Sequence, residues 1–187
     1  NRDSALVPTT GRYQQANIEL GTPAGNLQYY RFSYQHQYYY PIAKGYTLAF
    51  NTEIGYGHGY HGDSFPMIKN YLAGGIGSVR GYETNTIGPY STMTQTDGTK
   101  QNVPTGGSSK LINSIEFSIP LPGSGVDRTV RLFSFIDAGA IYKEGSFYSL
   151  ADLRYSYGLG FSWISPIGPL KFSYGIPVKL KEGDKSQ

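Results

Sequence analysis

The stretch LRYSYGLGFSW, residues 153–163, has a large apolar side chain at every odd position and a small or polar one at every even position. Because side chains alternate between the two faces of a β-strand, one face of this segment is wholly apolar and the other small and polar. A strand with lipid on one side and water on the other has this pattern. The segment therefore predicts one strand of a membrane-spanning β-barrel.

Seven segments of the chain carry the same alternation and are long enough for tilted transmembrane strands. They are Gly11–Gly21, Tyr29–Ile42, Tyr46–Gly57, Lys110–Leu121, Thr129–Tyr142, Leu153–Trp163 and Gly168–Val178. A soluble β-sandwich also alternates, but it does not need aromatic side chains on the outer face of nearly every strand. The fold class predicted is therefore all-β, an antiparallel transmembrane β-barrel.

The composition agrees with this prediction and excludes several other classes. The chain has 25 glycines, 18 tyrosines and only 16% charged residues, and tyrosine suits the membrane interface. With no cysteine, neither a disulfide framework nor a thiolate metal site is possible. The net charge of +3 is spread along the chain without a basic run, so we expect no nucleic-acid partner.

The connections between the predicted strands differ in length. Pro41–Gly45, Leu121–Arg128 and Ser165–Gly168 read as compact turns, whereas His58–Ser109 is long for a connection without structure of its own. Seven strands do not close a bacterial barrel, and open strand edges are costly in lipid. We therefore expect the chain to be an internal piece of a longer barrel protein, or to have a partner at both edges.

The long connection contains the segment Tyr71–Pro89, with the motif Val79-Arg80-Gly81-Tyr82 inside it. This segment resembles a loop of the BamA family, the barrel subunits of the outer-membrane β-barrel assembly machinery. Other parts of the chain carry the same resemblance: Gly55–Gly57, Phe135–Gly139, Trp163–Leu170 and Gly183–Asp184. The resemblance covers essentially the whole chain.

The resemblance implies a domain organisation. Residues 1–187 would form the C-terminal half of an outer-membrane β-barrel domain, about seven to eight strands of a sixteen-stranded barrel whose final strand is missing here. A long extracellular loop at about 58–109 would fold back into the lumen. There the arginine of the motif would meet acidic side chains of the barrel wall.

The residue types fit that implication. Alternation places Glu116 and Asp137 on inward faces, and the resemblance implies that they are the partners of Arg80, whose guanidinium can bind carboxylates through two parallel hydrogen bonds. Phe133 and Phe135 also face inward, where we expect the loop to pack on them. The alternative is that Arg80 is merely solvated on a mobile loop.

Two glycines beside the motif complete the predicted site. Gly74 and Gly75 let the loop backbone approach the wall closely, and we expect them to belong to the packing between loop and barrel.

The resemblance implies a protein of the bacterial outer membrane that folds and inserts other β-barrel proteins and is not an enzyme. Its partners would be the lipid bilayer, unfolded outer-membrane proteins and, through periplasmic domains, accessory lipoproteins; no cofactor or metal is expected. A two-partner secretion transporter or a translocation and assembly module barrel carries the same arginine loop and stays open as an alternative. A passive porin or a barrel hydrolase that uses His61 and Asp63 is a third possibility.

Overall fold

The computed structural model describes residues 2, 8–21, 28–96, 98–121, 130–146, 149–165 and 167–186. Thr129, most of the turn Leu121–Arg128, and Pro166 lie outside the described residues. No helix with the length and apolar character that a membrane crossing requires occurs in the described ranges.

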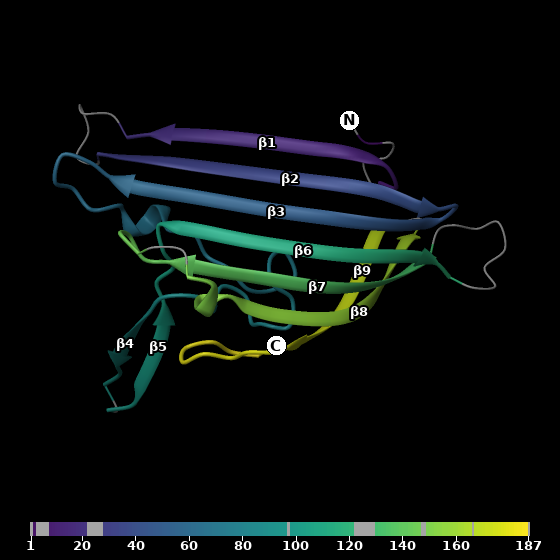
Figure 1. Cartoon of the computed structure of the whole chain (residues 1–187). Coiled ribbons are helices and arrows are strands. Elements are labelled where there is room, and N and C mark those ends of the chain that lie inside the picture. The colour runs from purple at the N-terminus through teal and green to yellow at the C-terminus, as the bar shows by residue number, and fades with distance from the viewer. Residues whose placement is uncertain are drawn as a thin grey trace.

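Seven long strands form one antiparallel sheet in the order β1-β2-β3-β6-β7-β8-β9 (Figure 1). Their bounds are β1 Gly11–Leu20, β2 Tyr29–Ala43, β3 Tyr46–Gly59, β6 Ser109–Pro120, β7 Val130–Tyr142, β8 Arg154–Ser165 and β9 Gly168–Pro177. Each strand pairs with its neighbour along the chain, and β3 pairs with β6 across the long connection. The all-β prediction and all seven predicted strands are confirmed, with bounds that differ by at most two residues.

Two expectations about the connections need correction. The turn expected at Pro41–Gly45 is only Lys44–Gly45, because β2 continues to Ala43 through a register irregularity at Pro41, which has no N–H to pair. The long connection is not free of structure, since it holds a 3-10 turn, η1 Met67–Lys69, and a hairpin, β4 Tyr90–Thr94 and β5 Lys100–Pro104. A second 3-10 turn, η2 Leu150–Asp152, precedes β8.

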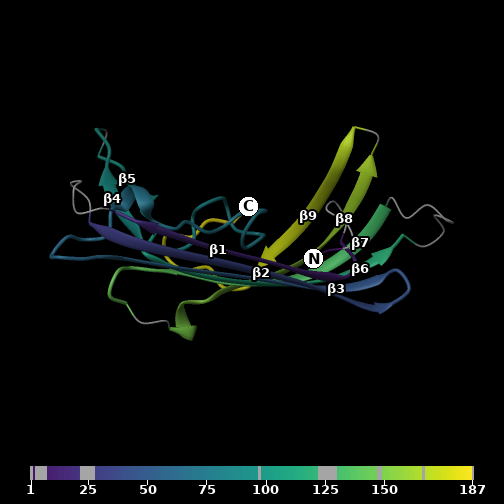
Figure 2. The same ribbon diagram turned by 90° about the horizontal axis from the view of Figure 1, so that it is seen from above.

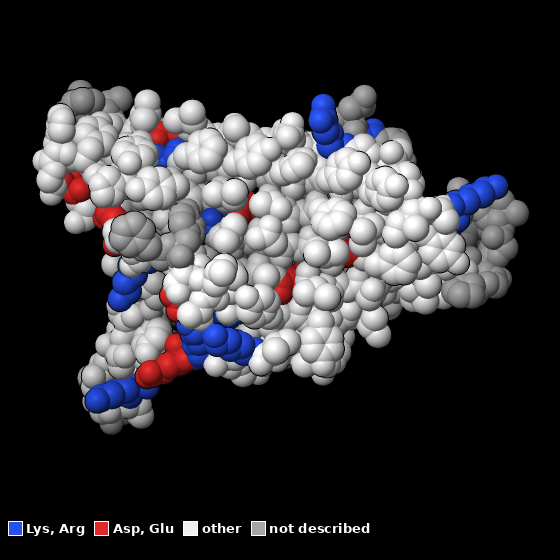
Figure 3. Space-filling view, in the orientation of Figure 1, with Lys and Arg blue, Asp and Glu red and all other residues white. Residues whose placement is uncertain are grey.

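The two faces of the sheet differ as the alternation predicts. The large side chains of β8 are exposed on its convex face, Leu159 by 68% and Tyr157 by 51%. Charged atoms are sparse over the middle of this face and gather toward the strand ends (Figure 3). The apolar face of each strand is therefore available to lipid rather than packed into a protein core.

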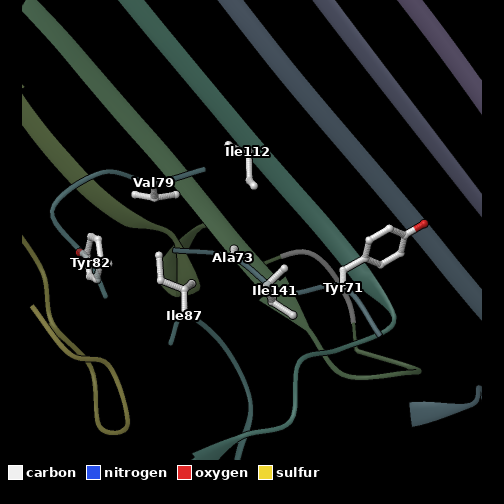
Figure 4. Packing of buried hydrophobic residues seen from close by; sticks show 7 residues of the cluster. All are labelled: Tyr71, Ala73, Val79, Tyr82, Ile87, Ile112 and Ile141. Carbon is white, nitrogen blue, oxygen red and sulfur yellow. The ribbon is translucent and has the colours of Figure 1, made fainter. Parts of the chain in front are cut away.

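The sheet curves like a trough, with β8 and β9 rising out of the plane of β1–β3 (Figure 2). The long connection and the C-terminal segment lie on the concave side of this trough. The main apolar core sits there, between connection and sheet (Figure 4): Tyr71, Ala73, Val79, Tyr82, Ile87, Ile112 and Ile141. In contrast to a globular β protein, the chain buries side chains of its long connection on the concave face and exposes the large apolar side chains on the convex face of its strands.

Candidate functional site

Backbone hydrogen bonds hold the long connection in a fixed path over the concave face. Tyr71 and Gly107 exchange two of them, at 2.7 and 3.0 Å, and the Ile87 N–H donates to the Ala73 carbonyl at 3.0 Å. Between these pairs the chain makes a tight turn, in which the Gly75 N–H donates to the Val79 carbonyl at 3.1 Å. The motif therefore begins at a defined point of the loop.

Gly74 and Gly75 give this turn its shape. Their φ angles are +113° and +89°, values that residues other than glycine rarely adopt. A Cβ on Gly74 would lie 2.5 Å from the Glu83 carbonyl oxygen, and one on Gly75 would lie 2.7 Å from the Thr84 hydroxyl. Both glycines thus pack the loop against itself, whereas we expected them to pack it against the wall.

Glycines of the strands make room for the side chains of the loop. A Cβ on Gly139 of β7 would lie 2.5 Å from Val79, and one on Gly55 of β3 would lie 2.6 Å from the Tyr71 ring. Val79 is fully buried, beside Ile112 of β6 in the apolar cluster (Figure 4). The first residue of the motif is therefore an apolar anchor on the sheet.

The guanidinium of Arg80 binds three side chains of β6 and β7. Its Nε and Nη2 donate to the two carboxylate oxygens of Asp137, both at 2.7 Å, in the bidentate arrangement that arginine favours. Nη1 donates to Glu116 Oε2 at 2.9 Å, and Nη2 also donates to the Ser114 hydroxyl at 2.9 Å. The backbone N–H of Arg80 adds a bond to Asp137 at 3.0 Å.

Arg80 and Asp137 form a buried ion pair. The Arg80 side chain is 8% exposed and that of Asp137 is fully buried. Burial alone disfavours the charged guanidinium, but the hydrogen bonds and charges of Asp137, and then of Glu116, outweigh it and raise the pKa of Arg80 above its ordinary value. Removing one partner from a buried ion pair usually costs about 3–5 kcal/mol, because the other charge is left uncompensated.

Lys171 of β9 extends the charge network across the sheet. Its ammonium donates to both oxygens of Glu116 at 2.9 Å and lies 4.5 Å from the centroid of the Phe133 ring. Glu116 therefore bridges two cations, one from the loop and one from the wall. The sequence prediction included Glu116 but neither Lys171 nor Ser114.

Phe133 and Phe135 are 3% exposed and lie on the concave face of β7, where alternation places them. The guanidinium carbon of Arg80 lies 3.5 Å from the centroid of the Phe135 ring, a cation–π contact. A Cβ on Gly158 would lie 2.6 Å from the Phe135 ring, and Gly160 lies against the Phe133 ring in the same way. Glycines on the small face of β8 thus make space for the aromatic support of Arg80.

The second half of the motif contacts other elements. Gly81, with a φ of +87°, approaches β9 so closely that a Cβ would lie 2.8 Å from the Gly175 carbonyl carbon. Tyr82 is fully buried, and this burial raises the pKa of its phenol. Its hydroxyl donates to the Lys179 carbonyl at 2.6 Å. The motif therefore joins β6 and β7 on one side to β9 and the segment after it on the other.

Another buried arginine, Arg154 of β8, was not predicted as a site residue from the sequence. Its Nε and Nη2 donate to the two oxygens of Asp184 at 2.9 and 3.0 Å, and the two side chains are 6% and 0% exposed. A signal was present, because Arg154 is the one charged residue on an otherwise small inward face of its strand. The sequence did not indicate which carboxylate it would bind.

Two histidines near the end of β3, His58 inside the strand and His61 after it, make contacts within the protein. His58 Nδ1 lies 2.9 Å from Glu144, whose carboxylate also accepts the Gly59 and Phe65 N–H groups at 2.8 Å. His61 has a φ of +58° and contacts the Tyr60 ring edge to face. Within the described residues, no group of three or more His, Asp or Glu side chains is placed to hold a metal ion.

Comparisons with known proteins agree with one another. The model of the Omp85 superfamily domain matches residues 1–187. The outer membrane protein assembly factor BamA of Neisseria meningitidis serogroup B is 36% identical over 210 residues, which cover 99% of this chain and 26% of the relative. The sorting and assembly machinery component 50 homolog of Mus musculus is 28% identical over 201 residues, covering 99% of this chain and 40% of the relative.

Among solved structures, that of BamA from Haemophilus ducreyi lacking POTRA domains 1–3 superimposes with a TM-score of 0.87 at 29% identity. The superposition covers all of this chain and 38% of that one. The chain therefore spans less than half the length of each of these relatives.

Proposed function

Because the chain belongs to the Omp85 superfamily, we propose that it is part of the barrel of an outer-membrane protein assembly factor, which folds and inserts other β-barrel proteins into the bacterial outer membrane. The names of the Neisseria and mouse relatives, assembly factor and assembly machinery component, support this choice within the superfamily. No observation favours the two-partner secretion or translocation alternatives.

The concave face of the sheet is, in this proposal, the inner wall of the barrel, and residues 60–108 are an extracellular loop that turns back into the lumen. The observation that supports it most is the placement of Arg80, a buried cation of the loop that binds Asp137 and Glu116 of two wall strands. An arginine on a solvated loop would keep its charge in water, because burying an unpaired charge is very costly. The burial of Arg80 therefore requires the carboxylates that pair with it on the wall.

The proposed role of the loop is to brace the wall. Arg80 ties β6 and β7 together from inside, and Gly81 contacts β9. A barrel that admits client strands at a weakly paired seam adds them by edge pairing, and it needs the rest of its wall to hold its shape meanwhile. The chain supplies positioned contacts rather than a reaction, so we propose that it is not an enzyme.

The partners follow from the same proposal. Lipid would cover the convex face with its exposed apolar side chains. Unfolded outer-membrane proteins would be the clients, and accessory lipoproteins would bind periplasmic domains of the full-length protein. Neither a cofactor nor nucleic acid has a part in this mechanism.

Substitution of Arg80 in the full-length protein tests the proposal. Arg80→Ala leaves Asp137 buried without its cation, so we expect at least a tenfold loss in the rate of client insertion into vesicles. Arg80→Lys keeps the charge but loses the bidentate geometry, and we expect an intermediate rate. Normal insertion and growth with Arg80→Ala would show that the loop has no bracing role.

A cysteine pair tests where the loop lies. Ser78 and Ser114 line one cavity between loop and wall, and the described chain has no competing thiol. With both replaced by cysteine, a short bismaleimide should crosslink them in intact cells. Rapid labelling of Ser78→Cys by an impermeant reagent, without a crosslink, would contradict the inward position.

A further inference from the structure

The segment after β9, residues 178–186, lies across the loop on the concave face; we call it the strap. Its path begins with the Val178 N–H donating to the Tyr155 carbonyl at 2.8 Å. It then passes beside Tyr82, as the yellow trace near that side chain shows (Figure 4). The strap therefore lies against Tyr82, in the second half of the motif.

The strap binds the second half of the motif through its backbone. Tyr82 and Ser186 form an antiparallel bridge, and the Glu83 N–H donates to the Lys185 carbonyl at 2.8 Å. Tyr82 donates its hydroxyl to the Lys179 carbonyl at 2.6 Å. The strap thus contacts Tyr82 at its backbone and at its hydroxyl, which also donates to the Tyr155 carbonyl of β8 at 3.1 Å, and the side chain is fully buried.

One buried ion pair fixes the strap. Asp184 accepts both hydrogen bonds from Arg154 of β8 and a third from the Lys181 N–H at 2.9 Å, which closes a turn of the strap. Arg154 also donates Nη1 to the Asp152 carbonyl at 2.9 Å, so its position is set by β8 and the turn before it. The strap is held to the wall by a charge pair as buried as that of Arg80 and Asp137.

We propose that Arg154 and Asp184 are positioning residues that hold the strap over the loop, and that the strap in turn holds the Tyr82 half of the motif. The motif then has two polar attachments besides the packing of Val79 and Gly81 on the sheet: Arg80 binds β6 and β7, and Tyr82 binds the strap and the Tyr155 carbonyl of β8. Any displacement of the chain that follows β9 reaches the loop through the second attachment. This deepens the proposed bracing role and rests on it only for its effect on client insertion.

Crosslinking in the full-length protein separates the two attachments. A Glu83→Cys and Lys185→Cys pair reports on the strap, since these residues are backbone neighbours with half-exposed side chains. The Ser78→Cys and Ser114→Cys pair reports on the wall attachment. Heat-modifiable mobility on gels reports on the folded barrel.

Asp184→Asn removes the charge that Arg154 binds, and we expect at least a fivefold lower strap crosslink with the wall crosslink and the mobility unchanged. The comparison variant is Asp152→Asn, which removes the half-exposed carboxylate that binds Lys181 of the strap; because an exposed ion pair contributes little, it should lower the strap crosslink far less than Asp184→Asn and leave the wall crosslink unchanged. An unchanged strap crosslink in Asp184→Asn overturns the proposal, and so does an equal fall in both crosslinks, which would mean a general loosening.

A milder variant covers the case in which Asp184→Asn does not fold. Arg154→Lys keeps the charge without the two parallel bonds, and a partial loss of the strap crosslink is expected; an undiminished one overturns the proposal. A lost strap crosslink with normal client insertion leaves the strap assignment standing and counts against the bracing role, so the two failures are distinguishable.

Discussion

Gly81 lies where the loop comes closest to β9, and two separate features exclude a side chain there. Its φ of +87° costs an L-residue about 1–2 kcal/mol, and a Cβ would lie 2.8 Å from the Gly175 carbonyl carbon. We therefore expect Gly81→Ala to lower the free energy of unfolding by at least about 2 kcal/mol and to weaken the wall crosslink.

Gly77 gives a matched control in the same loop. Its φ is outside the left-handed region, and a Cβ there would have no neighbour within 4 Å. Gly77→Ala should unfold in urea, in lipid vesicles, at the same midpoint as the unsubstituted protein. Equal effects at both positions would mean that the approach to β9 does not constrain the loop.

At the candidate site, the inward positions of the acidic residues and their pairing with Arg80 could be predicted, but a partner set by strand register could not. Alternation gave the inward direction of Glu116 and Asp137, and the family resemblance suggested their pairing with Arg80. Ser114 was missed because its contact depends on register: β6 and β7 place it directly beside Asp137. Register between strands is not encoded within either strand alone, so single-sequence reasoning does not find such a partner.

At the scale of elements, alternation predicted strand bounds well because a barrel strand has two solvents and each imposes one face. The hairpin β4–β5 was missed for the opposite reason. Its strands, YSTMT and KQNVP, have no apolar face, and most of their residues are exposed. With nothing to bury, these segments show no hydrophobic period to detect.

The register between strands also aligns the polar residues that interrupt the apolar face. Gln14, His36, Thr52 and Asn113 are polar residues at positions that alternation assigns to the lipid face, and the pairings align them in one row across β1, β2, β3 and β6. The Thr52 hydroxyl donates to Asn113 Oδ1 at 2.9 Å, and Gln14 donates to the Tyr34 hydroxyl at 3.0 Å. Thr52 and Asn113, and Gln14 and Tyr34, thus satisfy polar groups of one another within the sheet.

This pairing predicts an unusual pattern of stability. Thr52→Val alone leaves the Asn113 amide without its donor in lipid, and we expect a loss of about 1 kcal/mol. Thr52→Val combined with Asn113→Leu removes both polar groups, so the double variant should equal or exceed the unsubstituted protein. Urea unfolding in vesicles measures both; a double variant less stable than the single one would place these side chains away from lipid.

At the scale of the whole molecule, the described sheet is a curved wall with β1 and β9 at its edges. In hydrocarbon an unpaired edge is very unfavourable, since every orphan backbone group costs several kcal/mol. The loop and strap do not relieve this cost, because they pack on the concave face rather than along an edge. Pairing at both edges, with further strands of the same polypeptide or with another chain, is therefore a condition for a stable membrane position.

We accordingly expect the 187-residue chain, expressed alone and transferred into detergent, to associate through β1 and β9 into a mixture of oligomers. Sedimentation and crosslinking between cysteines placed on the two edge strands measure this association. The full-length protein in the same detergent is the control and should sediment as a single species. A monodisperse monomer with slow amide exchange along both edges would contradict the expectation, because it would mean that the wall protects its edges without any added strand.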